Sequence, residues 1–222
     1  MSGSCASHVF DGPALFRGVF SMIELLEGAL NPDPIAQFLL WFDDAITNNA
    51  PQPDAMILAT CSSDGHPSAR VVLLKSADQR GFVFVSNYNS RKGREIDDNP
   101  EGSLVFHWPT IERQVRIEGV LTKTSPEESD SLFAARARDH QLSSVASPQS
   151  DVMTLDELDR RYSSIENTYA GLPIPRPPHW GGYLLRPRCI EFWQHRFARM
   201  NDRVLYTKNG DGRRWEKLRL AP

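Results

Sequence analysis

The spacing of the hydrophobic positions changes near residue 50. Between residues 33 and 47 apolar residues recur every three or four positions, which predicts an amphipathic helix. Asp33 can cap this helix and Pro34 suits its first turn. Two prolines in the segment 48–54 end it. The apolar positions of the predicted helix are Ile35, Phe38, Leu39, Phe42 and Ile46.

From Ala55 onward, short apolar or alternating runs separated by turn residues predict antiparallel β structure. Helical patterns interrupt the runs at 90–99, 126–137 and 154–169, without the regular strand and helix alternation of a parallel sheet. The predicted fold class is therefore mainly β, a small barrel with peripheral helices. The predicted strands are 55–61, 68–75, 82–86, 103–108, 113–123, 181–186, 189–194 and 202–207, and the turn residues 209–212 predict a hairpin before 213–220.

Residues 1–30 lack clear periodicity, so we expect a mobile arm followed by a single domain over 31–222. A chain of 222 residues, 40% of them hydrophobic, can bury the core of one such domain. Its net charge of -3 provides no general positive field, and we expect neither nucleic acid nor membrane as a partner. Three scattered cysteines without a CxxC pair fit a reducing compartment. We predict a soluble cytoplasmic protein.

The sequence carries no pattern for nucleotide-loop, nucleophilic or metal chemistry. Neither GxGxxG after a strand nor GxxxxGK[ST] occurs. The histidines and cysteines form no metal-binding motif, and no Ser-His-Asp or Cys-His arrangement is indicated. Any redox chemistry would come from an organic cofactor that the protein binds and orients.

Basic residues gather beside predicted strand ends and helix starts. In a net acidic protein such groups are candidate phosphate sites, above all where a helix N-terminus adds free N–H groups. The alternative is that they are solvated strand edges. In a regular strand Arg70 and Lys75 point to opposite faces, so they would serve different ligands or different parts of one extended site. The groups are Arg70 with Lys75, Arg91 with Lys92, and Arg113 beside Gln114.

Two further segments carry candidate ligand contacts. Gln149 and Ser150 offer an amide and a hydroxyl for a polar heterocycle or a phosphate, although such pairs also form turns. Trp193 could wall a flat aromatic ligand, and Arg199 and Arg203 can face together if their segment is helical. The alternative there is a core tryptophan with surface arginines.

A series of segments resembles, in order and spacing, the pyridoxamine 5'-phosphate oxidase family. The resemblance covers about residues 33–222 and implies a split β-barrel of the antiparallel Greek-key type. It also implies a homodimer that binds FMN at the subunit interface and oxidises pyridoxamine or pyridoxine 5'-phosphate to pyridoxal 5'-phosphate with O2, releasing H2O2. The segments are SARVVLLK, SNYNSRKGREIDDNP, ERQVRIEG, QS, WGGY, EFWQ, then R-x-x-D-R, and RLAP.

The resemblance implies a set of FMN contacts. On the phosphate and ribityl side they are Arg70, Arg91, Lys92, Gln149 and Ser150. A reduced flavin gains negative charge at its N1–C2=O edge, which favours nearby hydrogen-bond donors. The other implied flavin contacts are Val71, Val72, Leu73, Leu74, Val85, Ser86, Gln114, Trp193 and Arg203.

The substrate side follows the family less closely. Leu132 replaces a phosphate-binding tyrosine, His140 a serine and Asn201 a substrate-contacting histidine. Leucine forms no hydrogen bond, and losing one to a charged phosphate costs on the order of 1.5–3 kcal/mol. The implied substrate-binding residues are Lys75, Leu132, Arg136, His140, Arg199, Met200 and Asn201, with Arg199 and Asn201 as the catalytic ones.

These departures keep other functions open beside the vitamin-phosphate oxidase. The loop LSSVASPQS resembles that of the phenazine-biosynthesis flavin oxidases, which act on unphosphorylated reduced tricycles. A non-catalytic module that binds flavin or pyridoxal phosphate is a second alternative, and a purely structural barrel is a third.

Overall fold

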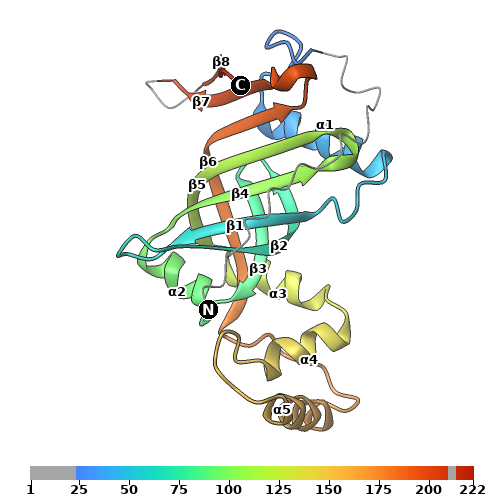
Figure 1. Ribbon diagram of the computed structural model, residues 1–222. Helices are drawn as coiled ribbons and strands as arrows, with labels where there is room; N and C mark the ends of the chain where they lie inside the picture. The colour runs from blue at the N-terminus through green and yellow to red at the C-terminus, as the bar shows by residue number, and fades with distance from the viewer. Residues whose placement is uncertain (1–23, 210–213) are drawn as a thin grey trace, which may run out of the picture.

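The computed structural model describes residues 24–209 and 214–222, and one antiparallel sheet of eight strands forms its centre (Figure 1). The strand order is β3-β2-β1-β4-β5-β6-β7-β8, and a further pairing of β3 with β6 closes β1 to β6 into a barrel. Because β4 returns beside β1 after the meander of β1 to β3, the topology is a Greek key and the predicted fold class is confirmed. The strands are β1 (Ala55–Cys61), β2 (Pro67–Asp78), β3 (Gly81–Asn87), β4 (Glu101–Trp108), β5 (Arg113–Lys123), β6 (Trp180–Gln194), β7 (Asp202–Lys208) and β8 (Trp215–Arg219).

The helices lie around the barrel, with α3, α4 and α5 together below one end in Figure 1. The first helix begins as predicted, because the Asp33 side chain accepts a hydrogen bond from the Ile35 N–H and Pro34 is the first helical residue. The α-helices of the described residues are α1 (Pro34–Thr47), α2 (Arg91–Asp98), α3 (Pro126–Ala134), α4 (Arg138–Ala146) and α5 (Leu155–Thr168); short 3-10 helices are η2 (Pro109–Ile111) and η3 (Phe197–Arg199).

Aromatic rings fill much of the barrel interior and fix α1 against it. The Phe38 ring centroid lies 4.9 Å from that of Phe82 and 4.8 Å from that of Phe106. Trp41 meets Phe192 edge to face at 5.0 Å. All of these side chains are buried, and such ring pairs stabilise a core beyond the area that they bury. The barrel is thus a solid core, and any ligand must bind outside it.

Two elements differ from the sequence prediction. The predicted strands 181–186 and 189–194 form one continuous strand, β6, because Pro187 interrupts the alternation in the sequence without ending the strand. At that point the pairing with β5 shifts register between Glu118 and Gly119. Helix α4 was not predicted, since its N-cap residue Ala137 forms no side-chain cap and its apolar pattern is weak. Residues 210–212 of the predicted hairpin lie outside the described residues.

The packed part of the chain begins earlier than predicted. Residues 1–23 of the expected arm lie outside the described residues, but 24–30 pack on the barrel. The Leu25 N–H donates to Asp202, and the Lys217 ammonium donates to the carbonyl oxygens of Glu27 and Leu30. Leu25 and Leu30 are also buried. These contacts come from β7 and β8, which no local periodicity in 24–30 reveals.

A second, smaller hydrophobic cluster lies under α3, α4 and α5. It contains Phe133, Leu142, Ile174 and Trp180. Helix α5 buries none of its own residues fully. Its Tyr162 and Ile165 are partly buried against this cluster, and the Arg161 guanidinium donates a hydrogen bond to the Ala146 carbonyl. The helical end of the molecule therefore has much less core than the barrel.

The described residues contain no helix that is both long enough and apolar enough to cross a membrane.

Candidate functional site

A cavity of about 880 Å³ lies between the barrel and the helical end of the molecule. Strands β2 and β3 and the start of α2 form one wall, and α4 with the segment that follows it forms the other. Most of the predicted phosphate-side and substrate-side cations lie here. The predicted residues that line the cavity are Arg70, Val71, Val72, Leu73, Lys75, Val85, Ser86, Arg91, Lys92, Arg136, His140, Gln149 and Ser150.

Lys92 is the most enclosed cation of the cavity. It is 8% exposed, and its ammonium donates to Ser86 Oγ at 3.0 Å, Ser90 Oγ at 3.1 Å and Gln149 Oε1 at 3.1 Å. Burial, with the nearby Arg70 guanidinium as second cause, lowers the pKa of Lys92 to about 8. The ammonium is therefore held without a full counter-charge, which suits an anionic ligand.

The start of α2 is joined to the opposite wall of the cavity. Ser90 caps the helix by accepting from the Gly93 N–H. The first helical N–H, that of Arg91, donates to Ser150 Oγ at 3.1 Å. Ser150 adopts a left-handed backbone conformation, with φ 80°. A helix N-terminus and two basic side chains thus converge where the sequence predicted a phosphate site.

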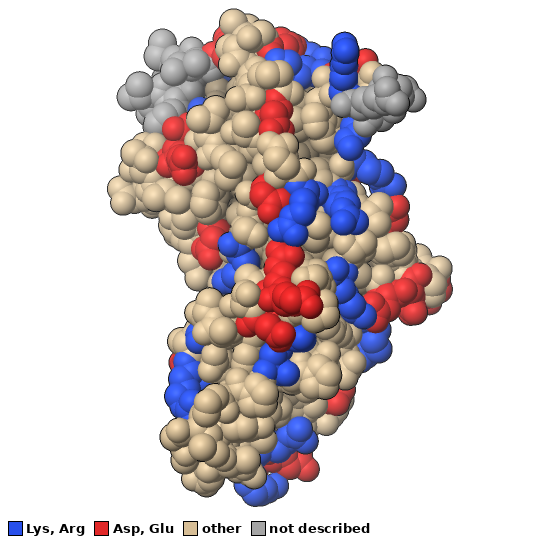
Figure 2. Space-filling model, turned by 180° about the vertical axis from the view of Figure 1, so that it is seen from behind, with Lys and Arg blue, Asp and Glu red and all other residues tan. Residues whose placement is uncertain are grey.

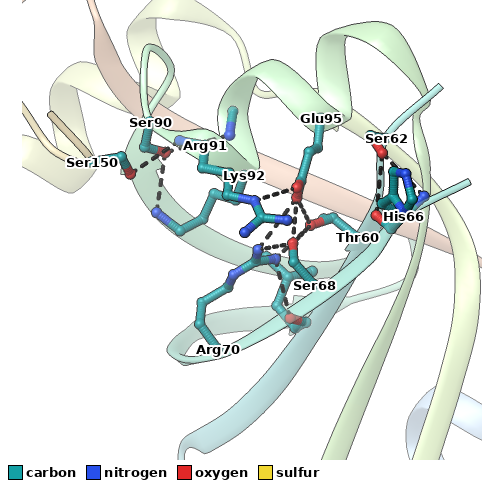
Figure 3. A network of polar contacts seen from close by, with 12 residues as sticks. Thr60, Ser62, His66, Ser68, Arg70, Ser90, Arg91, Lys92, Glu95 and Ser150 are labelled. Atoms are coloured by element: carbon teal, nitrogen blue, oxygen red, sulfur yellow. Dashed lines mark hydrogen bonds and ion pairs between the residues drawn. The ribbon is translucent and has the colours of Figure 1, made fainter. Parts of the chain in front are cut away.

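A network of hydrogen bonds and ion pairs is centred on Glu95, which lies behind these cations and does not line the cavity (Figure 3). Its carboxylate accepts from Thr60 Oγ1 at 2.5 Å, Ser68 Oγ at 2.6 Å, Arg70 Nη2 at 3.3 Å and Arg91 Nε at 2.8 Å. These hydrogen bonds and the Arg70 charge outweigh burial and lower the pKa of Glu95 to about 2. Glu95 is therefore ionised across the physiological range.

Strand register explains why these hydroxyls meet. Thr60 of β1 pairs directly with Ser68 of β2, and Leu58 pairs with Arg70. Residues two apart on a strand share a face, so Ser68 and Arg70 lie on the same side of β2. Helix α2 covers that face and presents Glu95 to it.

Arg70 and Lys75 line the same cavity from alternate positions of β2. Exposure alternates along the strand, with Arg70 at a partly buried position and Lys75 at an exposed one. Alternate positions point to opposite faces, as predicted for this pair. Both sets of positions line the cavity, so the two cations belong to different parts of one extended site. The pairing of β2 with β3 shifts register only beyond Leu74.

On the helical wall, Arg136 stacks on an aromatic ring. Its guanidinium carbon lies 5.0 Å from the centroid of Trp180, and its buried Nε has no hydrogen-bond partner among the described residues. Burial lowers the pKa of Arg136 from its usual value. His140 lies one turn further along and is exposed at the cavity. The guanidinium also donates to the His140 carbonyl at 3.4 Å, and because Arg136 lines the cavity its charge suits an anionic ligand there.

A second group of predicted residues lies elsewhere in the chain. Gln114 of β5 pairs with Trp193 of β6, which pairs in turn with Arg203 of β7, so the three form one row across the sheet. The Arg203 guanidinium donates to buried Glu191 at 2.8 Å. Trp193 lies at the opposite end of β6 from the cavity residue Trp180. Within one chain, this row does not line the described cavity.

Arg199, Met200 and Asn201 belong to this distant end. Ala198 and Arg199 adopt left-handed backbone conformations, with φ 58° and 62°, in and beside the turn of η3. Arg199 and Met200 are exposed, whereas Asn201 Oδ1 accepts from the Arg196 N–H. The strained turn presents Arg199 to solvent, and a single chain leaves it away from the cavity.

Two residues that were predicted to contact ligands pack against hydrophobic clusters. Leu74 is partly buried and packs on the barrel core. Leu132 packs against the second hydrophobic cluster and is not among the residues that line the described cavity. Leu132 thus joins a core and offers no hydrogen bond to a ligand.

Sequence analysis missed several polar residues of the site. The spacing of Arg91 and Glu95, four apart on a helix, signals an ion pair and could have been used. Thr60 and Ser68 could not be found without the register of β1 and β2. The further lining residues that it missed are Ser68, Ala69, Asn87, Ser143, Ser144, Ser147 and Trp180.

The positive charge of the cavity is a local feature. On the face shown in Figure 2, basic and acidic side chains lie next to one another and no broad area carries one sign. Pairs such as Arg80 with Glu128 and Arg188 with Glu101 neutralise much of the surface charge. Among the described residues, no group of three or more His, Cys, Asp or Glu could hold a metal ion.

Most of the chain matches two family models, one after the other along the sequence. Residues 42–160 match the model of pyridoxamine 5'-phosphate oxidase, and residues 180–222 match the pyridoxine 5'-phosphate oxidase C-terminal dimerisation region. Similar proteins include a pyridoxine/pyridoxamine 5'-phosphate oxidase of Rubrobacter xylanophilus, 50% identical over 93% of this chain and 94% of the relative. The protein of the same name from Cupriavidus metallidurans is 47% identical over 93% and 97%.

A solved structure shares both fold and sequence features. PhzG from Burkholderia lata, in complex with tetrahydrophenazine-1-carboxylic acid, matches with a TM-score of 0.85 and 31% identity, over 91% of this chain and 100% of that chain. A pyridoxamine 5'-phosphate oxidase-related, FMN binding protein from Nostoc punctiforme has the same fold, with a TM-score of 0.70 and 17% identity, over 87% and 100%.

Proposed function

The chain belongs to the pyridoxamine 5'-phosphate oxidase family and is an FMN-dependent oxidase, and we propose that it converts pyridoxamine or pyridoxine 5'-phosphate to pyridoxal 5'-phosphate. In this reaction O2 accepts two electrons and two protons and leaves as H2O2; the amine substrate also takes up water and releases ammonia. The observation that carries the proposal is that Lys75 and Arg136 line the same cavity as Arg70, Arg91 and Lys92. Two groups of cations in one cavity suit two phosphates, one of the cofactor and one of the substrate.

The cations around α2 fit the phosphate of FMN. Arg70, Arg91 and Lys92 carry three positive charges and Glu95 one negative charge, so the group sums to about +2, and a phosphate monoester carries about −1.5 to −2 at pH 7. Gln149 and Ser150 add an amide and a hydroxyl on the opposite wall. Bound FMN supplies the acceptor for the hydride that leaves the substrate carbon.

The row at the far end of β6 would complete the flavin site from a second chain. The match of residues 180–222 to a dimerisation region supports a homodimer. On β2, Val71 is 66% exposed and Leu73 37% exposed, beside the cavity. Apolar strand positions with this exposure suit a subunit interface. We place FMN there, against the backbone of 71–74 and 85–86, with Gln114, Trp193 and Arg203 contributed by the partner.

The substrate contacts are also divided between the two chains of the proposed homodimer. Lys75 and Arg136 bind the substrate phosphate, with His140 beside them in the cavity, while Leu132, whose side chain packs against the second hydrophobic cluster, can give the phosphate no hydrogen bond. Arg199 reaches over the substrate ring from the other chain, with Met200 and Asn201 next to it. The exposure of Arg199 on a left-handed turn supports this role, because such strain persists at sites where a side chain must be aimed.

A related flavin oxidase of phenazine type is the second candidate. It is favoured by the likeness to PhzG and by three serines, Ser143, Ser144 and Ser147, that line the cavity beside His140. Its substrate would be an unphosphorylated reduced heterocycle, for which Lys75 and Arg136 have no phosphate to bind.

One assay separates the two candidates. The protein loaded with FMN is given pyridoxamine 5'-phosphate, unphosphorylated pyridoxamine, or a reduced tricyclic carboxylate, and peroxide release is followed. We expect kcat/KM for the phosphorylated amine to exceed that for pyridoxamine at least about a hundredfold, since phosphate contacts with two cations contribute several charge-assisted hydrogen bonds. Turnover of the tricycle alone would reject the proposed substrate.

FMN affinity should depend on pH through Lys92. Its pKa in the free protein is about 8, and binding of an anion favours the protonated form. Above pH 8 the free ammonium has lost its proton, so FMN binding must take one up. The dissociation constant should stay constant from about pH 6.5 to 7.5 and rise about tenfold by pH 9.

Titration of flavin fluorescence against pH measures this dependence. Lys92→Arg is the matched control, since a guanidinium keeps its charge throughout this range. The variant should give a nearly flat profile between pH 7 and 9. An unchanged rise in the variant would show that another group titrates.

A further inference from the structure

A single buried carboxylate joins the two arginines of the proposed phosphate site. Glu95 is 6% exposed and lies behind the cavity without lining it. Its Oε2 accepts from Arg70 and its Oε1 accepts from Arg91, while Thr60 and Ser68 donate to Oε2. One carboxylate thus contacts groups from β1, β2 and α2 (Figure 3).

We propose that Glu95 is a positioning residue for the cofactor, which holds the Arg70 and Arg91 guanidinium groups aimed at the FMN phosphate. The inference rests on the proposed role of these arginines. Arg91 needs such a support most, because its side chain is 60% exposed and long side chains at the surface are otherwise free to change rotamer. Fixing a side chain before the ligand arrives removes an entropic cost from binding.

Arg70 is fixed from two further directions. Its guanidinium also donates to Thr60 Oγ1 and Ser68 Oγ, the hydroxyls that donate to Glu95. Each hydroxyl therefore accepts from the arginine and donates to the carboxylate, which fixes the direction of both hydrogen bonds. The carboxylate organises the arginine directly and through the two hydroxyls.

Positioning and charge predict opposite effects on FMN affinity when Glu95 is neutralised. Glu95 is an anion close to the site of another anion, so simple electrostatics says that its neutralisation should tighten FMN binding. Positioning says that binding should weaken. The sign of the change in affinity therefore separates the two roles.

Glu95→Gln is the informative change because the amide keeps the shape and removes one acceptor. A carboxylate accepts on both oxygens, whereas an amide accepts on one and donates from the other atom. Either Arg70 or Arg91 then faces an N–H2 group and loses its partner. The matched control is Asp97→Asn on the same helix, since Asp97 pairs with Lys123 outside the cavity.

The experiment compares FMN with riboflavin, which lacks the phosphate, in titrations of the cofactor-free full-length protein. We expect Glu95→Gln to raise the FMN dissociation constant about tenfold and to leave that of riboflavin within about twofold. Asp97→Asn should change neither. Thermal unfolding of each cofactor-free variant reports folding, and substrate turnover by the parent tests the proposed function separately.

Two results would overturn the positioning role. One is unchanged or tighter FMN binding by Glu95→Gln. The other is an equal loss of FMN and riboflavin affinity, which a general disturbance of the fold would cause. If Glu95→Gln does not fold, Thr60→Val removes one hydroxyl of the network at nearly constant volume. Thr60→Val should raise the dissociation constant of FMN about threefold and leave that of riboflavin unchanged. An FMN dissociation constant equal to that of the parent would reject the positioning role.

A pH profile gives an independent readout. Glu95 raises the pKa of Lys92, against the lowering effects of burial and Arg70. In Glu95→Gln the Lys92 pKa should fall further, and the loss of FMN affinity at alkaline pH should begin at a lower pH than in the parent. A profile with the parent's midpoint would contradict the electrostatic link between Glu95 and the cofactor site.

Discussion

Replacing Arg70 by methionine is expected to abolish practical FMN binding, with a dissociation constant raised about a hundredfold or more. The guanidinium lines the cavity beside Lys92 and supplies charge that the remaining cations cannot replace. Glu95 keeps Thr60, Ser68 and Arg91 as partners, so the variant should fold. Flavin fluorescence titration measures the loss, and the purified protein should be nearly colourless.

Arg80→Met is the matched control for this change. Arg80 belongs to the turn after β2, and its partners Asp78 and Glu128 lie outside the cavity. Its removal deletes the same charge and nearly the same side chain from the same region. FMN affinity should stay within about twofold of the parent, since exposed ion pairs contribute little. If Arg70→Met and Arg80→Met bind FMN with equal affinity, Arg70 does not contact the cofactor.

The second large effect is expected on the substrate side. In the double variant Lys75→Met with Arg136→Met, kcat/KM for pyridoxamine 5'-phosphate should fall about 10²- to 10³-fold, because both charged contacts to the substrate phosphate are lost. FMN binding should change little, since Arg70, Arg91 and Lys92 remain. Steady-state peroxide release and flavin titration on the same samples measure both quantities.

Unphosphorylated pyridoxamine provides the internal comparison. It has no phosphate for Lys75 and Arg136 to bind, so its kcat/KM should be nearly the same in parent and variant. A double variant of Lys123→Met and Arg188→Met controls for the loss of two positive charges, as both residues pair with carboxylates outside the cavity. A parallel loss for both substrates would mean that Lys75 and Arg136 maintain the fold of the site and do not recognise phosphate.

Local patterns predicted the elements of this molecule well. The Asp33 cap, the apolar face of α1 and most strand positions follow from residues within a few positions of one another. The grouping of Arg91 and Lys92 at a helix start was equally local. By contrast, the pairing of β3 with β6, which closes the barrel, joins residues about a hundred positions apart and leaves no local trace.

The features that differ from the sequence predictions depend on contacts between residues far apart in the chain. Helix α4 packs Leu142 into a cluster with Trp180, which compensates for its missing cap. Residues 24–30 are held by Asp202 and Lys217 from the other end of the chain. Single-sequence patterns contain none of these partners.

The two walls of the cavity differ in a way that bears on how ligands enter and leave. One wall belongs to the barrel, whose strands share a continuous aromatic core. The other belongs to α4 and the segment after it, and α5, which packs on α4, buries no residue fully. Segments with few buried contacts open at a small fraction of the global unfolding free energy. We therefore expect the helical pair to open locally at a lower free energy than the barrel.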